Sequence, residues 1–222
     1  MNNLNKNIEE LIKEIENSNN NNAICNKALK EIKNIFKNFY EDDADNFLKL
    51  CAVTVDKLFY LQRYNDIIYI KENIFNIKDK FQNINDILFL YPSAISNLML
   101  GFNDKAIKEL EELINNYDIE SSQIPPLQNF LAEAYLREKK FEESVKYYEK
   151  IIHLNITNAM MWNDYGYALE QIGRKEEAKN AYSKSLELDP SFIFAKRNLK
   201  RLNPKENLFK KIINFLLRVK NK

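Results

Sequence analysis

Residues 159–192 hold the pattern that most constrains the fold of this 222-residue chain. The small residues Gly166 and Ala178 alternate there with the aromatic residues Trp162 and Tyr182, and Pro190 closes the segment. This spacing is typical of one helix–turn–helix period, and two weaker copies precede it. One such period cannot bury its apolar face alone, so neighbouring periods have to stack. The sequence therefore predicts an all-α array of stacked helix pairs.

Glycine is scarce, which supports an all-α chain. The only glycines are Gly101, Gly166 and Gly173, whereas an average protein contains about 7% glycine. Helix interiors exclude glycine because it costs roughly 1 kcal/mol relative to alanine. Three isolated glycines also rule out the GxGxxG and GxxxxGK[ST] loops that bind phosphates.

Residues for catalysis or metal binding are sparse. His153 is the only histidine, so neither a two-histidine zinc site nor an HExxH motif can form. Cys25 and Cys51 lie far apart and lack a CxxC motif or an activating base, so we expect two reduced, packed thiols. We expect no enzyme activity, no cofactor and no metal. Among enzyme-related roles, a regulatory subunit is the alternative that the sequence favours.

Earlier segments repeat the scheme of residues 159–192. The predicted periods cover residues 49–85, 87–120, 125–158 and 159–192. Ala106 and Ser144 take the small position of Ala178 in the middle two periods. The first period is degenerate, with Ile68 at the small position and Asp56 at the glycine position.

The last period resembles the tetratricopeptide repeat. Trp162, Gly166, Ala178 and Pro190 match the pattern of that family outright. The resemblance implies a right-handed α-solenoid of stacked antiparallel helix pairs. We expect a helical N-terminal segment over residues 1–46, the repeat array over 47–192, and a capping helix followed by a basic amphipathic helix over 193–222.

The resemblance assigns a packing role to one set of residues. These are Gly101, Ala106, Ser144, Trp162, Gly166, Ala178, Tyr182 and Pro190. Small side chains are expected where two helices approach most closely, aromatic side chains around that crossing, and proline where the second helix stops. Ala106, Ser144 and Ala178 are the positions at which we expect bulk to be forbidden.

The resemblance also predicts a partner-binding groove lined by the first helix of each pair. Its expected residues are Tyr91, Ile95, Asn129, Glu133, Arg137, Asn163, Tyr167 and Glu170. Such a mixture suits a peptide, because apolar anchors give affinity and polar tips fix register. As an alternative, Tyr91 and Ile95 pack against a neighbouring helix.

The charges at the groove positions argue against one partner known for the family. Co-chaperone members hold the C-terminal carboxylate of heat-shock chaperones with lysine, asparagine and arginine. Those positions read Tyr91, Ile95, Phe130, Met160 and Asp164 here. Because no cation is present and Asp164 repels an acidic tail, we expect a protein or peptide partner other than the chaperone carboxylate.

The C-terminal segment is strongly basic. Residues 193–222 contain ten lysine and arginine residues and one glutamate, against a net charge of +1 for the whole chain. From residue 206 onward, apolar positions sweep an arc of roughly 200°, wider than a helix docked on one neighbour needs. The sequence leaves three alternatives: the helix folds back, lies at a membrane interface, or forms a dimer contact. The residues expected to make a membrane or dimer contact are Phe209, Ile212, Phe215, Leu216, Lys210, Lys211 and Arg218.

These features favour a non-catalytic protein–protein interaction scaffold that holds a peptide or helix in its concave groove. The alternative is a peripheral membrane adaptor anchored by the basic C-terminal helix. Nucleic acid is disfavoured, because no base-stacking aromatic is evident beside the cations and the acidic remainder of the chain repels a duplex. With no secretory signal and no apolar run of about 18 residues, we expect a cytoplasmic protein, or one peripheral at the inner membrane surface.

Overall fold

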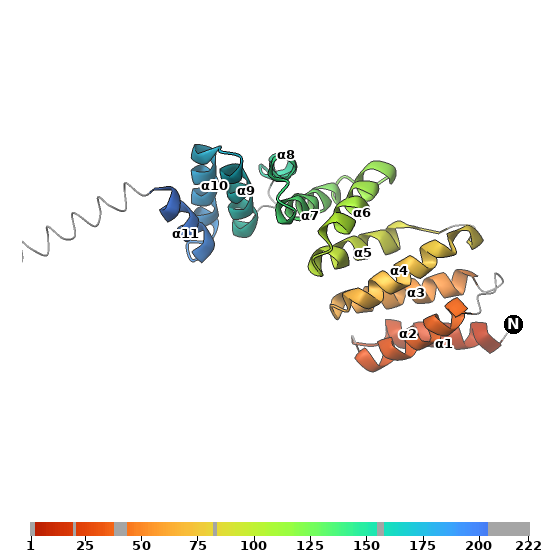
Figure 1. Cartoon of the computed structure of the whole chain (residues 1–222). Coiled ribbons are helices and arrows are strands. Elements are labelled where there is room, and N and C mark those ends of the chain that lie inside the picture. The colour runs from red at the N-terminus through yellow and green to blue at the C-terminus, as the bar shows by residue number, and fades with distance from the viewer. Residues whose placement is uncertain (1–2, 20, 38–43, 82–83, 155–157, 204–222) are drawn as a thin grey trace, which may run out of the picture. The chain divides into compact units, whose positions relative to one another are not determined.

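The computed structural model describes residues 3–19, 21–37, 44–81, 84–154 and 158–203 (Figure 1). Every regular element within these residues is a helix. The chain divides into two compact units, which are called unit 1 (residues 1–120) and unit 2 (residues 121–222). The C-terminal residues predicted to make a membrane or dimer contact lie outside the described residues: Phe209, Lys210, Lys211, Ile212, Phe215, Leu216 and Arg218.

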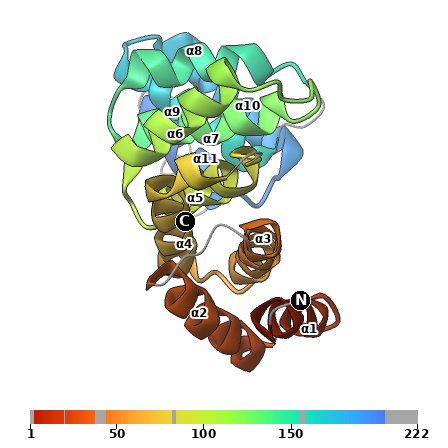
Figure 2. The ribbon, with the colours of Figure 1, turned by 90° about the vertical axis from the view of Figure 1, so that its right-hand side faces the viewer.

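Each unit consists of consecutive helices joined by short connections (Figures 1 and 2). The helices of unit 1 are α1 (Asn3–Glu16), α2 (Asn22–Lys37), α3 (Ala44–Tyr60), α4 (Tyr64–Asn76), the 3-10 turn η2 (Lys78–Lys80), α5 (Ile87–Met99) and α6 (Asn103–Asn116). Those of unit 2 are α7 (Ile124–Arg137), α8 (Phe141–Ile151), α9 (Ala159–Gln171), α10 (Lys175–Leu188) and α11 (Ile193–Leu202). The predicted all-α fold of stacked helix pairs is confirmed. The predicted division into residues 1–46, 47–192 and 193–222 stays a prediction.

The first helices of successive pairs form a row within each unit. In unit 1, α3 packs against both α1 and α5. In unit 2, α9 packs against α7 and α11, as well as against its own partner α10. The row places the first-helix side chains of neighbouring pairs side by side, which is how repeat arrays form a binding surface.

Four of the pairs turn through the same backbone geometry. Gln62, Gly101, Lys139 and Gly173 all have positive φ, between 57° and 83°. In each turn the N–H of this residue donates to the carbonyl oxygen of the residue three positions earlier. The N–H of the following residue donates to a carbonyl oxygen five positions before that following residue. This is the Schellman motif, which satisfies the last carbonyls of the first helix.

The shared turn corrects the register of the first predicted period. Counting from Gln62 instead of from the apolar pattern puts Ile67 at the small position, where it is fully buried, and Ile68 is half-buried. We predicted Ile68 for that position, one residue too far along. Gln62 stands at this turn, so no glycine marked it as Gly101 and Gly173 mark two of the later turns, and the apolar pattern alone gave the wrong register.

The helices α9 and α10 of unit 2 approach each other closely at Gly166. A Cβ atom on Gly166 would lie 2.9 Å from two ring carbons of Tyr182 and 3.2 Å from the carbonyl oxygen of Ala178. Tyr182 and Ala178 are both completely buried. Only glycine therefore fits without displacing the Tyr182 ring.

The other packing residues lie at several kinds of position. Ala106 and Ser144 are completely buried, and the Ser144 hydroxyl donates to the carbonyl oxygen of Ala132 on the neighbouring helix, 2.9 Å away. Trp162 is half-buried against Tyr165. Three further positions are at the surface or in turns: Gly101 and Gly173 in turns and Pro190 two residues after α10 ends.

Candidate functional site

The first-helix row of unit 2 carries a cluster of charged and polar side chains. Arg137 forms an ion pair with Glu133 one turn earlier on α7. Asp164 lies on α9, and the charges of both Glu133 and Arg137 act on it. Two carboxylates thus share one arginine, which leaves the cluster with a negative charge when both are ionised. We call Glu133, Arg137 and Asp164 the acidic cluster.

Burial perturbs the most enclosed member of this cluster. Burial of the Asp164 carboxyl, with a further contribution from the nearby charge of Glu133, raises its pKa from 3.8 to about 6, although a hydrogen bond from Asn163 works in the opposite direction. Burial likewise raises the pKa of Tyr148, beneath the same charges. A desolvated carboxylate of this kind gains by contact with a cation or an N–H donor.

Exposed apolar side chains accompany the acidic cluster on α9. Tyr167 is 38% exposed, and its ring meets the edge of Phe141 at 6.1 Å between centroids. Met160 is 56% exposed. Asn129 on α7 and Asn163 on α9 both stand ten residues before the turn residue of their pair; Asn129 is half-buried and Asn163 is buried. Apolar and polar groups are therefore both present on this row.

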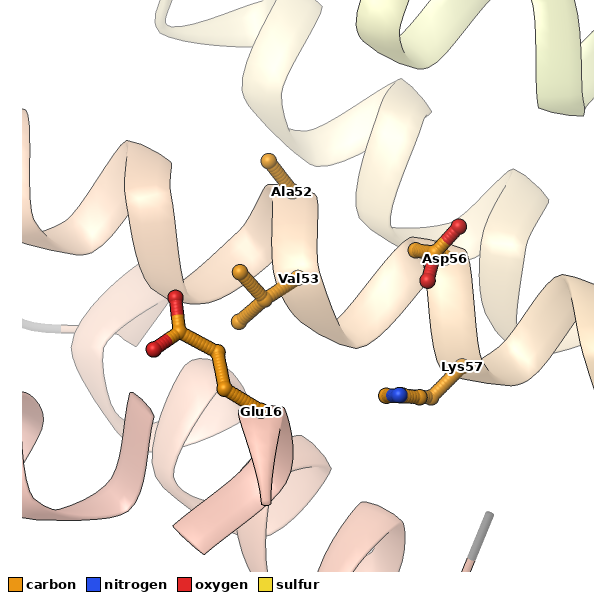
Figure 3. A pocket seen from close by; sticks show the side chains of 5 residues that line it. All are labelled: Glu16, Ala52, Val53, Asp56 and Lys57. Carbon is orange, nitrogen blue, oxygen red and sulfur yellow. The ribbon is translucent and has the colours of Figure 1, made fainter. Parts of the chain in front are cut away.

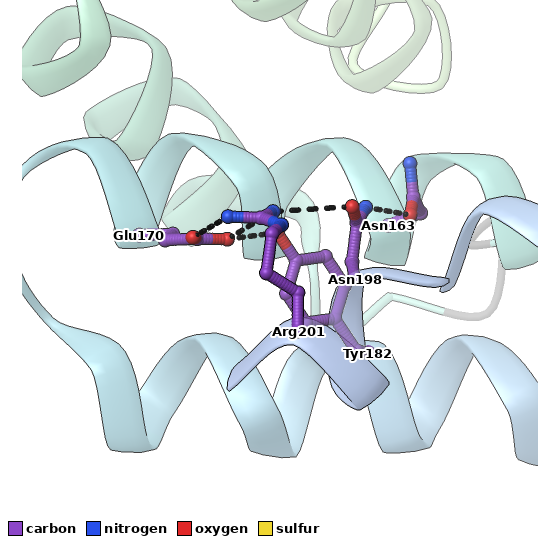
Figure 4. Close-up of polar contacts among 5 residues, drawn as sticks. All are labelled: Asn163, Glu170, Tyr182, Asn198 and Arg201. Atoms are coloured by element: carbon purple, nitrogen blue, oxygen red, sulfur yellow. Dashed lines mark hydrogen bonds and ion pairs between the residues drawn. The ribbon is translucent and has the colours of Figure 1, made fainter. Parts of the chain in front are cut away.

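Two of the predicted groove residues are engaged by α11 (Figure 4). Asn198 donates to the Asn163 side-chain oxygen at 3.0 Å. Arg201 forms a bidentate ion pair with Glu170, one arm of which is 2.8 Å long. Tyr182 donates its hydroxyl to the same carboxylate at 2.9 Å. Figure 4 shows these side chains converging from α9, α10 and α11; we call this network the α11 latch.

Unit 1 places its predicted groove residues differently. Ile95 is only 3% exposed. Tyr91 is half-buried, and burial raises the pKa of its hydroxyl. Both lie on α5, ten and six residues before Gly101, but Ile95 offers almost no surface to a partner.

A surface hollow of about 360 Å³ lies on the first-helix row of unit 1 (Figure 3). Its walls are Glu16 at the end of α1 and four residues of α3: Ala52, Val53, Asp56 and Lys57. Ala52 and Asp56 stand ten and six residues before Gln62, the spacing that Tyr91 and Ile95 keep from Gly101. These residues were missed because the first period was misregistered; the signal that locates them is the turn residue.

The described part of the chain shows neither a metal-binding cluster nor a membrane-spanning helix. No group of three or more His, Cys, Asp or Glu side chains there is placed to hold a metal ion. None of the described helices combines the length and apolarity needed to cross a bilayer. Cys25 and Cys51 are free and buried, and burial raises the pKa of both thiols.

Comparison with known proteins identifies the repeat. The family model of the tetratricopeptide repeat matches residues 125–155 and 159–192. This match confirms the resemblance inferred from Trp162, Gly166, Ala178 and Pro190.

Similar sequences include larger proteins. The peroxisomal targeting signal receptor of Saccharomyces cerevisiae is 30% identical over 120 residues, which are 54% of this chain and 19% of the yeast protein. The chloroplastic tetratricopeptide repeat domain-containing protein PYG7 of Arabidopsis thaliana is 26% identical over 112 residues, covering 50% of this chain and 37% of that protein. The chain thus spans about a fifth of the length of the yeast receptor.

Solved structures with the same arrangement of helices include MamA. The structure of MamA from Desulfovibrio magneticus covers 86% of this chain and 98% of its own, with a TM-score of 0.61 and 14% sequence identity. A second MamA structure, from MSR-1, has a TM-score of 0.56 at 19% identity and covers 69% of this chain and 83% of its own. At these identities the likeness concerns the fold alone.

Proposed function

Because residues 125–155 and 159–192 match the tetratricopeptide-repeat model, we propose that the protein is a non-catalytic interaction scaffold. It holds a peptide or helix of a partner protein on the first-helix row of unit 2. Arrays of stacked helix pairs present extended surfaces of this kind, and their rigidity keeps the ordering cost of binding low. The yeast relative is named as a receptor for a targeting signal, which agrees with a role in recognising another polypeptide.

The acidic cluster is the observation that carries this proposal. Glu133 and Asp164 come from adjacent helices and have one arginine between them. A lysine or arginine of the partner would neutralise the surplus negative charge through a charge-assisted hydrogen bond. Tyr167 and Met160 are exposed on the same helix as Asp164 and supply apolar contacts. We therefore assign the groove a segment that combines a basic residue with apolar neighbours.

The same charges argue against an acidic peptide. At neutral pH most Asp164 side chains are ionised, because the raised pKa is about 6. Glu133 adds a second carboxylate whose only close cation in the cluster is Arg137. A chaperone tail that ends in carboxylates would face like charges at this surface. Micromolar binding of such a peptide, abolished by Asp164→Lys, would show that this assignment is wrong.

The proposal is tested first with a random peptide library selected on the full-length protein. We expect the selected peptides to be enriched in lysine or arginine next to aliphatic or aromatic residues. The best peptide, labelled with fluorescein, then reports affinity by anisotropy. Replacing both carboxylates (Glu133→Gln with Asp164→Asn) should weaken binding by at least about tenfold, since two charge-assisted contacts are lost.

The matched control neutralises two carboxylates elsewhere. Glu142 and Glu143 are exposed at the start of α8, and Glu142→Gln with Glu143→Gln changes the net charge by the same amount. Equal loss of affinity in both double variants would show that the net charge of the protein, and not the acidic cluster, governs peptide binding. The variant Tyr167→Ala separates binding from packing: a groove role predicts lost binding with unchanged thermal stability, and a packing role predicts the reverse.

A second candidate function is peripheral attachment to a membrane through the C-terminal segment. The observation that favours it is the sequence of residues 193–222, with ten lysine and arginine residues and one glutamate. Liposome flotation of the full chain tests this function, and absence of flotation with anionic vesicles at low salt would remove it.

A further inference from the structure

The last described helix, α11, has an outward side rich in cations and exposed apolar groups. Ile193 and Phe194 are 50% and 57% exposed. Lys196, Arg197 and Lys200 are also exposed. The helix contains no acidic residue. With about 100° between successive residues, these five side chains fall within one arc of roughly 160°, and we call them the α11 face.

The opposite side of the helix is fixed to unit 2. Ala195 is completely buried, and Leu199 packs against the core of the unit. The α11 latch adds two polar contacts, from Asn198 and from Arg201 to α9. These contacts hold the α11 face in one orientation. Ala195, Asn198 and Leu199 lie outside the arc of the face, whereas Arg201 lies within it and reaches across to Glu170 (Figure 4).

Phe194, one of the two apolar residues of the α11 face, packs against a neighbouring aromatic ring. The Phe194 ring lies 5.6 Å from the ring of Phe192, measured between centroids. Phe192 is half-buried against the unit 2 core. The contact with Phe192 thus holds the Phe194 side chain in an exposed position, although burying this side chain against the protein would be favourable.

We propose that the α11 face binds a membrane surface that contains anionic phospholipids. Cations flanking exposed apolar side chains are the signature of a helix that lies in the interface, with its apolar groups among the acyl chains and its charges on lipid phosphates. Lysine and arginine serve this purpose well because their long side chains can reach the head groups while the helix sits deeper. The contact is peripheral, and the residues that we assign to it all lie on α11, outside the groove.

Two other polyanionic partners fit the face less well. A nucleic acid would engage the cations through its phosphates. Contrary to the expectation from the sequence, an exposed aromatic ring, Phe194, does stand beside these cations and could stack on one base. Ile193, however, would gain nothing from a sugar–phosphate backbone and would stay hydrated. An acidic protein surface, including that of a second copy, would pair with the cations in water, where such pairs contribute little. A lipid interface uses both the charges and the apolar side chains.

Flotation of the full-length protein tests the proposal with vesicles of phosphatidylcholine alone and with about 30% phosphatidylserine added. We expect flotation with the anionic vesicles at low salt and little with phosphatidylcholine alone. The variant Lys196→Gln with Arg197→Gln should lower partitioning about 30-fold, from about 1 kcal/mol for each cation near the surface. The variant Ile193→Ser with Phe194→Ser keeps all charges and should lower partitioning about tenfold.

The matched control removes the same charge from other helices. Lys146 on α8 and Lys175 on α10 are both exposed. The variant Lys146→Gln with Lys175→Gln should float like the unchanged protein. Every variant keeps residues 204–222, so a difference between the two charge variants reports on α11 alone.

The proposal is overturned if the Lys196/Arg197 variant floats as well as the control variant, which would assign any membrane binding to residues 204–222. It is also overturned if a polyuridine RNA binds as tightly as the vesicles, or if light scattering shows self-association that the same variant abolishes. Peptide affinity at the groove, measured in the same variants, should not change. Failure of the α11 face therefore leaves the groove proposal standing, and the converse also holds.

Discussion

Replacing Gly166 by alanine should destabilise unit 2, although alanine is the better helix former. Alanine gains about 1 kcal/mol over glycine in a helix interior. Against this, the new methyl group would lie 2.9 Å from two ring carbons of Tyr182 and 3.2 Å from the backbone carbonyl oxygen of Ala178. Overpacking of this kind costs about 1–3 kcal/mol.

The ring of Tyr182 has little freedom to withdraw. Its side chain is completely buried, and its hydroxyl donates to Glu170 at 2.9 Å. Moving the ring would strain or break a hydrogen bond to a charged group, which contributes about 1.5–3 kcal/mol. Subtracting the helix-propensity gain leaves about 0–2 kcal/mol of the overpacking cost. With roughly 1 kcal/mol more for strain on the hydrogen bond, we expect Gly166→Ala to lower the free energy of unfolding by about 1–3 kcal/mol.

Urea unfolding followed by tryptophan fluorescence measures this change. Trp162 is the only tryptophan and lies on α9, so its signal reports on unit 2 even if the two units unfold separately. The slope of the free energy with urea concentration should stay constant while the midpoint falls. A higher midpoint for Gly166→Ala would refute the packing argument.

A second background identifies the contact responsible. In Tyr182→Leu, which replaces the ring by a smaller side chain, Gly166→Ala should cost less than in the unchanged protein. The control is Gly173→Ala: no heavy atom lies within 4 Å of a Cβ there, but its φ of +83° penalises any side chain. The cost of the control, about 1–2 kcal/mol, should be the same in both backgrounds. An equal cost of Gly166→Ala in both backgrounds would show that Tyr182 is not the obstacle.

Three further changes test other contacts. Glu109→Gln should lower the stability of unit 1 by about 2–3 kcal/mol in urea unfolding followed by circular dichroism, because it leaves the largely buried Lys71 ammonium, 2.7 Å from Glu109, without its counter-charge; an unchanged midpoint would contradict this. The raised pKa of Asp164, about 6 in the folded state against 3.8 unfolded, means that the folded protein holds a proton the unfolded chain lacks. The stability from this group is complete below about pH 4 and is lost as pH rises through 6, so Asp164→Asn should flatten the pH dependence of unfolding, and equal slopes would count against it. Ser144→Ala should lower the free energy of unfolding by about 1 kcal/mol, because the hydrogen bond to Ala132 is lost. Ser144→Leu should lower it clearly more, because the larger side chain overpacks the site. Equal unfolding midpoints for the two variants would show that the helices do not pack tightly at Ser144.

The repeat pattern predicted the helical array because packing constrains the residues that define it. Gly166 and Ala178 have to be small where two helices cross, so their identity can be read without coordinates. The turn residues are less constrained. Gln62 and Lys139 adopt the same left-handed conformation as Gly101 and Gly173, at a cost of roughly 1–2 kcal/mol that the Schellman hydrogen bonds help to offset. A turn without glycine leaves no mark of its own. Around Lys139 the small residue Ser144 still gave the register, but the first period has Ile67 at that position, and its register was lost.

The candidate site was less predictable, because repeat geometry gives the side on which a residue lies but not its neighbours. Asn129, Glu133 and Tyr167 lie on the first-helix row at the expected spacing from their turns. Ile95 has the same spacing, yet it is almost fully buried in unit 1. What covers a position depends on helices outside its own period, and no motif records them.

The α11 latch links the groove to the last helix. Glu170 was predicted to face a partner, and it is already paired with Arg201 and Tyr182. A ligand that engages Glu170 has to replace both contacts, whereas a ligand that stops at Asp164 and Tyr167 leaves them intact. In the first case ligand binding loosens α11, and by linkage any partner that fixes α11 in its present orientation weakens that ligand by the same factor. If the proposed function holds, the acidic cluster and Tyr167 are therefore the part of the groove that a partner reaches while α11 stays docked.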